Sequence, residues 1–427
     1  MAEQLYFSRD SKMFIEFDGH VWEVPVLDGF SFSQATNSTE ITLNEMESSA
    51  GVSRRGRRAF NDSLAPGEWS FSTYVRPFQA ASGTANGTAD GSAKVHAVEE
   101  VLWALFAGAK NYDRSTYDFD TGGTNVITPA TSSSVINFGS SNSSTLGTAN
   151  VYFVLGDANQ KVMKLDGVTV NEASIDFDID GIATINWSGN ANNVLDFTGS
   201  THVDNTAPIH SDTTTDGTTM AVGDVWLDAN DGNRLYVTTN VTNGSEANTV
   251  YIDEAIRDTG NFIRNRLTVL TVTPTTRDPD SDSVNELEAN YSLTLTGGNI
   301  TMSNNNTYIT PEEIGTVNVP IGHVTGTRNF GGSFTCYLTE DTSTTNASGD
   351  FFEDLRGITN VVTNSFALVF KIGGASGTPR LEISMPTCHI EIPTHSIEDV
   401  ISLETNFMAL PSTIAEDDEA TLTYFGA

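Results

Sequence analysis

The chain has 427 residues, of which 38% are hydrophobic, and its formal net charge at pH 7 is −34. That hydrophobic fraction argues against wholesale disorder, and a chain of this length is expected to form two or three domains. The excess of Asp and Glu argues against direct binding to nucleic acid phosphates, because such binding needs Lys and Arg side chains. No apolar run reaches the roughly 18 residues of a membrane-spanning helix, and we expect no secretory signal at the N-terminus.

The N-terminal segment predicts β-structure. Residues 13–26 predict two short strands around a turn at Asp18-Gly19, and residues 30–45 predict one long strand. Residues 46–67 predict a polar loop that carries an arginine cluster. Residues 68–78 then alternate as a strand, which places four side chains on one face: Trp69, Phe71, Thr73 and Val75.

Residues 96–109 predict a helix, because apolar residues recur at helical spacing and Gly108 can end it. The recurring residues are Val98, Val101, Leu102, Leu105 and Phe106. Residues 112–148 are rich in Ser, Thr, Asn and Gly and predict a loop with one short strand at 135–138. Three further strands are predicted at 151–155, 161–179 and 183–188.

Residues 198–258 are rich in Thr and Asp at first and then predict a β-hairpin between 225–227 and 235–237. This pattern indicates a small β element appended to the outside. Trp226 and Tyr236 have two interpretations: they fill a small core, which we favour, or they stack on a sugar in a glycan-binding module. Glycan binding by the isolated segment would favour the second interpretation.

The later part of the chain repeats the earlier part. Residues 27–42 return as residues 295–310 without a gap, and six of 16 positions are identical. Three shorter blocks return in the same order: 70–75 as 333–338, 174–177 as 389–392, and 185–189 as 405–409. A strand predicted at 266–272 opens the second copy, and its helix is predicted at 350–356. A duplicated module lets three chains form a ring with six similar positions, and closed rings are a common result of head-to-tail contacts.

A search for catalytic and metal-binding motifs gives no candidate. The sequence has no HExxH motif, no Gly-rich phosphate loop and no GxSxG elbow. The Asp-rich tracts 228–233 and 278–283 invite a calcium interpretation, but neither has the EF-hand spacing, and we interpret both as solvated loops. Cys336 and Cys388 lie in apolar, strand-like contexts and predict two buried free thiols, with a disulfide as the alternative. We therefore expect no enzymatic activity, no cofactor and no metal.

Six long segments together resemble one family of structural proteins. They are NSTEITLNE (37–45), RRAFNDSL (57–64), EWSFSTYVRPF (68–78), DIDGIATINWSGNAN (178–192), NFIRNRLTVL (261–270) and GGNITMSNNNTYITPEEIGTVNVPIGHVTG (297–326). These segments resemble the tail tube protein of T-five-type long-tailed bacteriophages. They follow that family's order and cover most of the chain outside 198–258.

The resemblance implies a mainly β fold with two tandem tail tube modules, each a β-sandwich or barrel with one flanking helix. The modules are expected at residues 1–197 and 259–427, with the small β element inserted at 198–258. The resemblance also implies homotrimeric, pseudo-hexameric rings that stack into a hollow tube, through which DNA passes without specific binding. A distal tail or baseplate hub ring of the same fold is the alternative, and copy number in the particle separates the two.

The implied partners are further copies of the chain and, at the tube ends, the tape measure, terminator and distal tail proteins. The implied location is the virion tail, assembled in the host cytoplasm, with no membrane binding. The chain departs from the enterobacterial pattern because it ends at Ala427 with no C-terminal immunoglobulin-like domain and carries the element after Thr198. Whether the tail is contractile is left open.

Alternation in the segment 174–180 predicts two faces. Ile175, Phe177 and Ile179 share one face, and Asp176, Asp178 and Asp180 share the other. In the repeat, the block 389–392 places Glu391 in register with Asp176. A channel lined by carboxylates would repel DNA phosphates, so Asp176, Asp178 and Glu391 are candidates for the lumen. An outward solvated face is the alternative.

The loop 46–67 predicts a contact between stacked rings. It carries Arg54, Arg55, Arg57 and Arg58 in a strongly acidic chain, with Phe60 and Asp62 close by in sequence. Clustered arginines can pair with carboxylates of an adjacent ring, and repetition around the ring multiplies each small contribution. The counterpart in the second copy, residues 311–324, is shorter and lacks the cluster. A solvated turn is the alternative.

Overall fold

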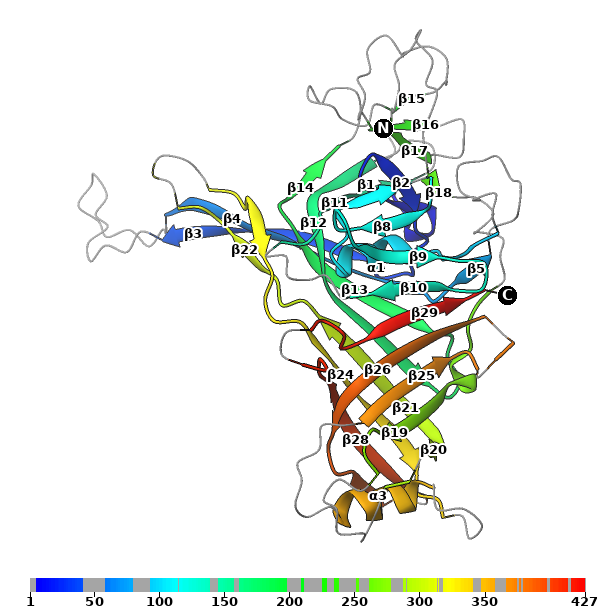
Figure 1. Ribbon diagram of the computed structural model, residues 1–427. Helices are drawn as coiled ribbons and strands as arrows, with labels where there is room; N and C mark the ends of the chain where they lie inside the picture. Colours follow the sequence, from blue (N-terminus) through cyan, green and yellow to red (C-terminus); the bar gives the residue numbers. More distant parts are fainter. Residues whose placement is uncertain are drawn as a thin grey trace, which may run out of the picture.

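Figure 1 shows the protein as a computed structural model, with strands in most of the described chain, which confirms the predicted mainly β fold. The structure describes residues 5–40, 58–79, 93–113, 115–138, 145–156, 161–197, 209–210, 225–228, 234–237, 251–252, 261–277, 287–288, 290–312, 314, 318–340, 347–357, 366–374, 376–377, 379–397, 400–413 and 416–426. We refer to residues 5–197 as the first half and to residues 261–426 as the second half.

The elements of the first half are η1 Ser8–Asp10, β1 Ser11–Phe17, β2 His20–Glu23, β3 Ser31–Glu40, β4 Ala59–Tyr74, β5 Pro77–Gln79, β6 Val95–Ala97, α1 Glu100–Phe106, β7 Asn111–Asp113, β8 Asp118–Asp120, β9 Asn125–Pro129, β10 Ser134–Asn137, β11 Ala149–Leu155, β12 Lys161–Asp178, β13 Thr184–Ala191 and β14 Asn193–Asp196. Between the halves lie β15 Ile209–His210, β16 Val225–Asp228, β17 Arg234–Val237 and β18 Tyr251–Ile252.

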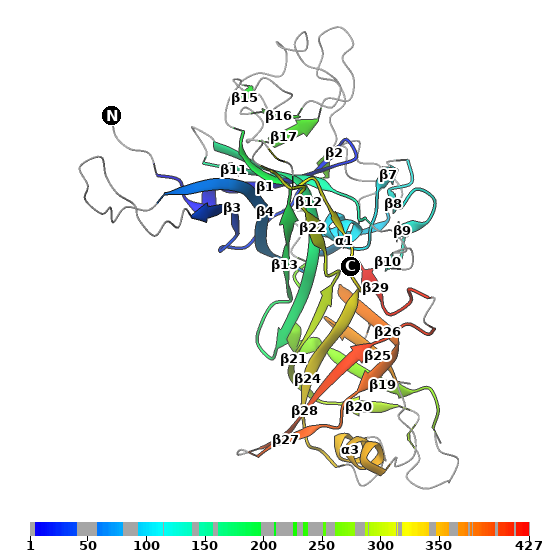
Figure 2. The ribbon, with the colours of Figure 1, turned by 90° about the vertical axis from the view of Figure 1, so that its left-hand side faces the viewer.

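The elements of the second half are η2 Asn265–Leu267, β19 Val269–Pro274, β20 Tyr291–Leu293, β21 Leu295–Ser303, β22 Thr307–Ile309, β23 Gly322–Val324, β24 Asn329–Tyr337, α3 Ser348–Gly357, β25 Phe366–Ile372, β26 Arg380–Ile390, β27 Thr394–Ile397, β28 Ile401–Ala409 and β29 Thr421–Phe425. Figure 2 places α3 at one end of the molecule and β15–β17 at the other.

One long antiparallel sheet joins the two halves. Its strands run in the order β3-β4-β13-β12-β21-β24-β28, and β26 followed by β27 pairs with the outer edge of β28. The N-terminal part of β12 turns into a second sheet with β14, β11, β1 and β2. In the second half, β26 likewise pairs with β29 and β25, which leads to β19 and β20.

The strand registers of the two halves coincide, including their irregularities. In the first half, Ala149 pairs with Val168 and Val151 with Leu165, so β12 has one extra residue between these pairs. In the second half, Phe366 pairs with Cys388 and Leu368 with Met385, so β26 has the same extra residue. β-Bulges of this kind are specific structural features. Their repetition means that the two halves are alike in strand register as well as in strand order.

A second bulge recurs where the long sheet continues. Val170 pairs with Gly189 and Glu172 with Ser188, which leaves one extra residue, Asn171, on β12. The corresponding pairs are Ile390 with Phe407 and Thr394 with Glu404, which again leave one extra residue on the β26–β27 side. These registers align Asn171 with Glu391, and Asp176 with Ser396. The sequence blocks 174–177 and 389–392 are therefore not in structural register, although they match as sequence.

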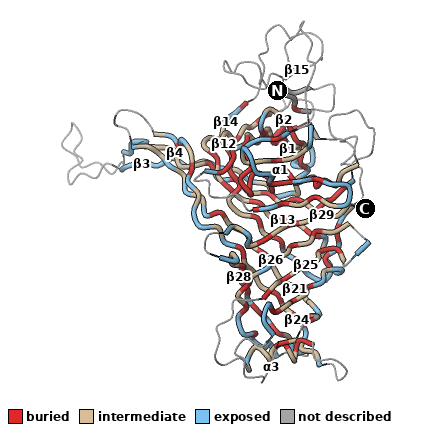
Figure 3. Tube along the Cα trace, in the orientation of Figure 1, coloured by how far each residue is buried: buried red, intermediate tan, exposed pale blue. Residues whose placement is uncertain are grey.

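A continuous cluster of buried side chains runs through both halves and around α1 (Figure 3). Trp103 of α1 packs edge-on against Trp187, with ring centroids 4.7 Å apart, and Phe106 meets Phe330 across the halves at 6.3 Å. Cys336 and Cys388 are buried and free, as predicted. Burial raises the pKa of Cys336 to about 11 and that of Cys388 to about 12, so both thiols stay protonated near neutral pH.

Several predicted elements are confirmed, and others need correction. The turn at Asp18-Gly19 joins β1 to β2, and both residues have positive φ, as a tight hairpin turn requires. The hairpin of β16 and β17 and the helix α3 also form, whereas residues 229–233 between the two strands lie outside the described residues. The helix α1 is shorter than predicted, because residues 95–97 pair with β5.

Three predicted boundaries were wrong. Residues 59–67, predicted as loop, belong to β4, and residues 41–57 lie outside the described part. The predicted loop 112–148 contains β7, β8 and β9 besides the expected strand β10. The strand predicted to begin at Arg266 begins at Val269, because residues 265–267 form a 3-10 turn.

A buried carboxyl group ties α1 to β29. Glu99 is fully buried, accepts a hydrogen bond from Tyr424 Oη at 2.7 Å, and lies beside the backbone N–H of Arg76 at 3.3 Å. Tyr424 Oη in turn accepts a hydrogen bond from Trp103 Nε1 at 2.7 Å. Burial raises the pKa of Glu99 from 4.5 to about 7, although these hydrogen bonds and Arg76 lower it.

We expect this carboxyl group to make stability depend on pH. Because the pKa of Glu99 is raised in the folded state, its contribution is fully present below about pH 4.5 and is lost as the pH rises through about 7. The loss is at most roughly 3 kcal/mol, from about 1.4 kcal/mol per pKa unit. Glu99→Gln should flatten this slope, and urea unfolding at about pH 5 and about pH 8 measures it. An equal slope in the wild type and Glu99→Gln would contradict the assignment.

Candidate functional site

The long sheet has one apolar face and one polar face. The apolar face packs on the core and includes Phe71, Ile175, Ile185, Ile300, Phe334 and Phe407, all less than 5% exposed. The polar face is formed by the intervening side chains, which are mostly Ser, Thr, Asn, Asp and Glu. Because side chains alternate along a strand, the registers place these residues on one continuous surface.

This polar face carries carboxylates and no cation. Six acidic side chains lie on it: Glu68, Glu172, Asp176, Asp178, Glu391 and Glu404. Within the part of each strand that forms this face, which for β12 is residues 171–178, the described residues include no Lys or Arg. The surface is therefore of one sign, and phosphates that approach it meet repulsion without a binding partner.

Amide side chains position two of these carboxylates. Ser72 Oγ donates to Asn186 Oδ1 at 2.7 Å, and Asn186 Nδ2 donates to Asp176 Oδ2 at 2.9 Å, so the bonds cross three strands. In the second half, Asn406 Nδ2 donates to Glu391 Oε2 at 2.9 Å. Each half thus holds an acidic side chain by an asparagine, although the registers align Asn186 with Glu404 and Asp176 with Ser396, so the two pairs do not occupy corresponding positions.

The three residues that the sequence proposed for a lumen are exposed, and they lie on this one face. Asp178 differs from the other two, because its Oδ1 accepts the backbone N–H of Gly181 at 2.7 Å and so closes the turn after β12. Ile179 was predicted to share one face with Ile175 and Phe177, which is wrong. β12 ends at Asp178, and Ile179 is 41% exposed in the turn. Glu68, Glu172 and Glu404 were not predicted to lie on this face, although the alternation of polar and apolar residues around each of them indicates it.

The residues proposed for ring stacking lie on a projecting arm, formed by the outer parts of β3 and β4 (residues 35–40 and 58–66; Figure 1). Arg58, Phe60 and Asp62 are exposed there, Phe60 by 63%, and Thr39 Oγ1 donates to Asp62 Oδ2 at 2.5 Å. Arg54, Arg55 and Arg57 lie outside the described residues. β3 pairs only with β4, so within the described chain its other edge carries no strand.

The part of the chain that the structure describes contains no group of three His, Cys, Asp or Glu side chains arranged to hold a metal ion. The two Asp-rich tracts lie mostly outside this part, as do the side chains of Trp226 and Tyr236. None of the described helices is both long and apolar enough to cross a membrane.

Comparison with known proteins identifies a relative. No family model matches the sequence. The tail tube protein pb6 of Escherichia phage T5 is 28% identical to this chain over 406 residues, which cover 94% of this chain and 70% of that protein. The chain is thus related to the T5-type tail tube proteins.

This relationship confirms the resemblance stated from the sequence segments. It supports a structural role in a phage tail tube and a location in the virion tail, and it points to a non-enzymatic protein that assembles with copies of itself.

Proposed function

We propose that the chain is the major tail tube subunit, that three copies close into a pseudo-hexameric ring, and that stacked rings form the conduit for DNA ejection. The observation that carries this proposal is the acidic face of the long sheet, together with the tail tube relative. With this face toward the lumen, DNA would pass a wall that offers hydrogen-bonding groups but no cation to bind its phosphates. The tube would be built in the host cytoplasm and joined at its ends to other tail proteins.

The repeated registers support a specific way of closing the ring. We propose that residues 1–197 and 259–427 are two copies of one module, with 198–258 inserted between them. Within the chain, β12 of the first module pairs with β21 of the second, with Ser174 opposite Thr301. The corresponding edges of the chain are β27 at one side and β3 at the other, and both are exposed. Pairing β27 with β3 of the next copy would close the sheet and remove its free edges.

The internal pairing predicts the register at this seam. Ser174 corresponds to Thr394, and Thr301 corresponds to Ser33, so Thr394 should lie opposite Ser33 of the next copy. Cysteines at directly opposed strand positions lie close enough for a disulfide. We therefore expect Ser33→Cys/Thr394→Cys to form disulfide-linked chains on oxidation, with the covalent trimer as the largest species on a non-reducing gel.

The control variant for the seam is Ser33→Cys/His395→Cys. His395 points to the opposite face, where its ring meets Phe352 at 4.4 Å, so this pair should stay unlinked. Covalent hexamers as the largest species would contradict three chains per ring, and equal linking in both variants would contradict the register.

A further inference from the structure

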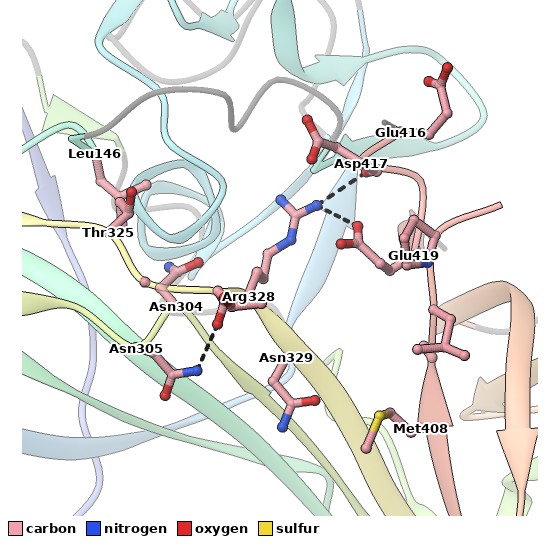
Figure 4. Close-up of a pocket in the computed structure, with 15 residues that line it drawn as sticks. Leu146, Asn304, Asn305, Thr325, Arg328, Asn329, Met408, Glu416, Asp417 and Glu419 are labelled. Carbon is pink, nitrogen blue, oxygen red and sulfur yellow. Dashed lines mark hydrogen bonds and ion pairs between the residues drawn. The ribbon is translucent and has the colours of Figure 1, made fainter. Parts of the chain in front are cut away.

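A cavity of about 620 Å³ opens at the end of the long sheet in the second half (Figure 4). We call it the socket. Its wall is formed by three segments and three further residues: Thr325–Asn329, Met408–Pro411, and Glu416, Asp417 and Glu419, with Leu146, Asn304 and Asn305. Arg328 fixes the acidic segment, because its guanidinium bonds the carbonyl oxygen of Asp417 and forms an ion pair with Glu419.

The corresponding place in the first half is filled by the chain itself. There the hairpin of β22 and β23 folds back, and Tyr308 Oη lies 3.0 Å from Thr169 Oγ1 and 3.1 Å from the carbonyl oxygen of Asn190. Thr169 is completely buried as a result. His323 Nε2 accepts the backbone N–H of Leu146 at 2.9 Å, which fixes the other strand of the hairpin.

The registers show that the socket is the open counterpart of this filled place. Thr169 pairs with Asn190 next to the second bulge, and His389 pairs with Met408 at the same step in the second half. Met408 lines the socket and is 48% exposed. The same surface is thus covered in one half and open in the other.

The segment that covers the first half also has a counterpart. In the gap-free repeat of 27–42 as 295–310, Tyr308 corresponds to Glu40, at the outer end of β3. β21 ends before β22, and between them Asn305 takes a left-handed conformation with φ of 50°. The hairpin of β22 and β23 therefore folds back onto its own chain. β3 continues without a break into the projecting arm, where its residues 35–40 are exposed in this chain (Figure 3).

We propose that the socket receives the arm, residues 35–40 and 58–66, of the adjacent copy in the same ring. This inference rests on the proposed ring closure, because pairing of β27 with β3 brings the next copy's arm over this end of the sheet. Two observations fit this occupant. The matching place in the first half is filled by Tyr308, the counterpart of Glu40 on the arm. The Nε–H of Arg328, whose side chain is 8% exposed, has no acceptor among the described residues, and an oxygen of the arm would supply one.

Chemical crosslinking of assembled rings tests this inference. Glu40→Cys/Met408→Cys should be joined by a short, flexible bis-maleimide into covalent trimers, because the arm would pass within a side-chain length of Met408. A linker is needed because the Tyr308 side chain spans the distance between the main chain of β22 and the strands β12 and β13, and the arm is expected to lie at a similar distance from Met408. The control is Glu40→Cys/Ser402→Cys, which moves the second cysteine six residues along the same face of β28, roughly 20 Å away. Single variants control for reaction of the buried Cys336 and Cys388.

The expected result is at least a tenfold higher yield of crosslinked trimer from the Met408 pair than from the Ser402 pair. Rings that link through Ser33→Cys/Thr394→Cys but not through Glu40→Cys/Met408→Cys would overturn the socket and leave the ring closure intact. Absence of both links would overturn the ring closure and the socket with it.

Discussion

Replacement of Asp176 and Glu391 by lysine will slow or stall DNA ejection while leaving the subunit folded. Both side chains are exposed on the polar face, and neither forms a salt bridge within the described chain. Their hydrogen bonds to Asn186 and Asn406 are solvent-accessible, so their loss should cost only about 1 kcal/mol each. In the assembled tube, each lysine would repeat along the channel and bind phosphates of the passing DNA.

The measurement is the rate of DNA ejection from particles that carry the double variant, at several salt concentrations. We expect a rate at least about tenfold lower at low salt, with recovery as salt rises, because phosphate contacts weaken with the logarithm of the salt concentration. Asp178 is left unchanged because it closes the turn after β12. The matched control is Glu353→Lys, an exposed carboxylate on α3 that is not part of the polar face of the long sheet. Ejection at the wild-type rate by the double variant would show that this face does not line the channel.

Replacement of Arg54, Arg55, Arg57 and Arg58 by glutamate will leave soluble rings that do not polymerise into tubes. An isolated exposed ion pair contributes only about 0–1 kcal/mol, but a ring repeats the contact and arginine binds carboxylates through two parallel hydrogen bonds. We therefore propose one basic contact per chain between adjacent rings. Exposed ion pairs weaken as salt rises, so tube growth of the wild type should also slow at high ionic strength.

Electron microscopy of the purified protein separates rings from tubes, and sedimentation measures the ring. The control replaces Arg9 and Arg277 by glutamate, since both side chains are more than half exposed and lie away from the arm. Tubes of normal length from the variant with four glutamates would show that the stacking contact lies elsewhere, at apolar side chains near Phe60 or in the acidic segment 415–427.

The sequence predicted the elements whose signal is local. Alternation located β12 and identified Asp176 and Asp178 as exposed, because one face of a half-buried strand must be polar. The arm was missed because Pro66 and Gly67 normally interrupt a strand. The structure accommodates Pro66 where pairing with β13 has just ended at Ala191–Gly67 and where the β3–β4 register shifts.

Other features depend on partners that are distant along the chain. The strand β10 was predicted from its local sequence, but nothing near Ser134 indicates that β29, far later in the chain, is its second partner beside β9. The polar face illustrates the same limit, because Glu68 and Glu404 belong to strands that only the sheet order brings beside Asp178. The sequence blocks 174–177 and 389–392 matched by residue type, whereas the bulges at Asn171 and before Thr394 set the structural register.

The position of β29 bears on the time at which the subunit becomes complete. This strand, translated after every other described strand, lies between β26 of the second half and β10 of the first. Its Tyr424 reaches Glu99 and Trp103, at a separation of more than 300 residues along the chain. Contacts at such separation form late in folding. The first half therefore cannot close before β29 has been synthesised and has paired with β10.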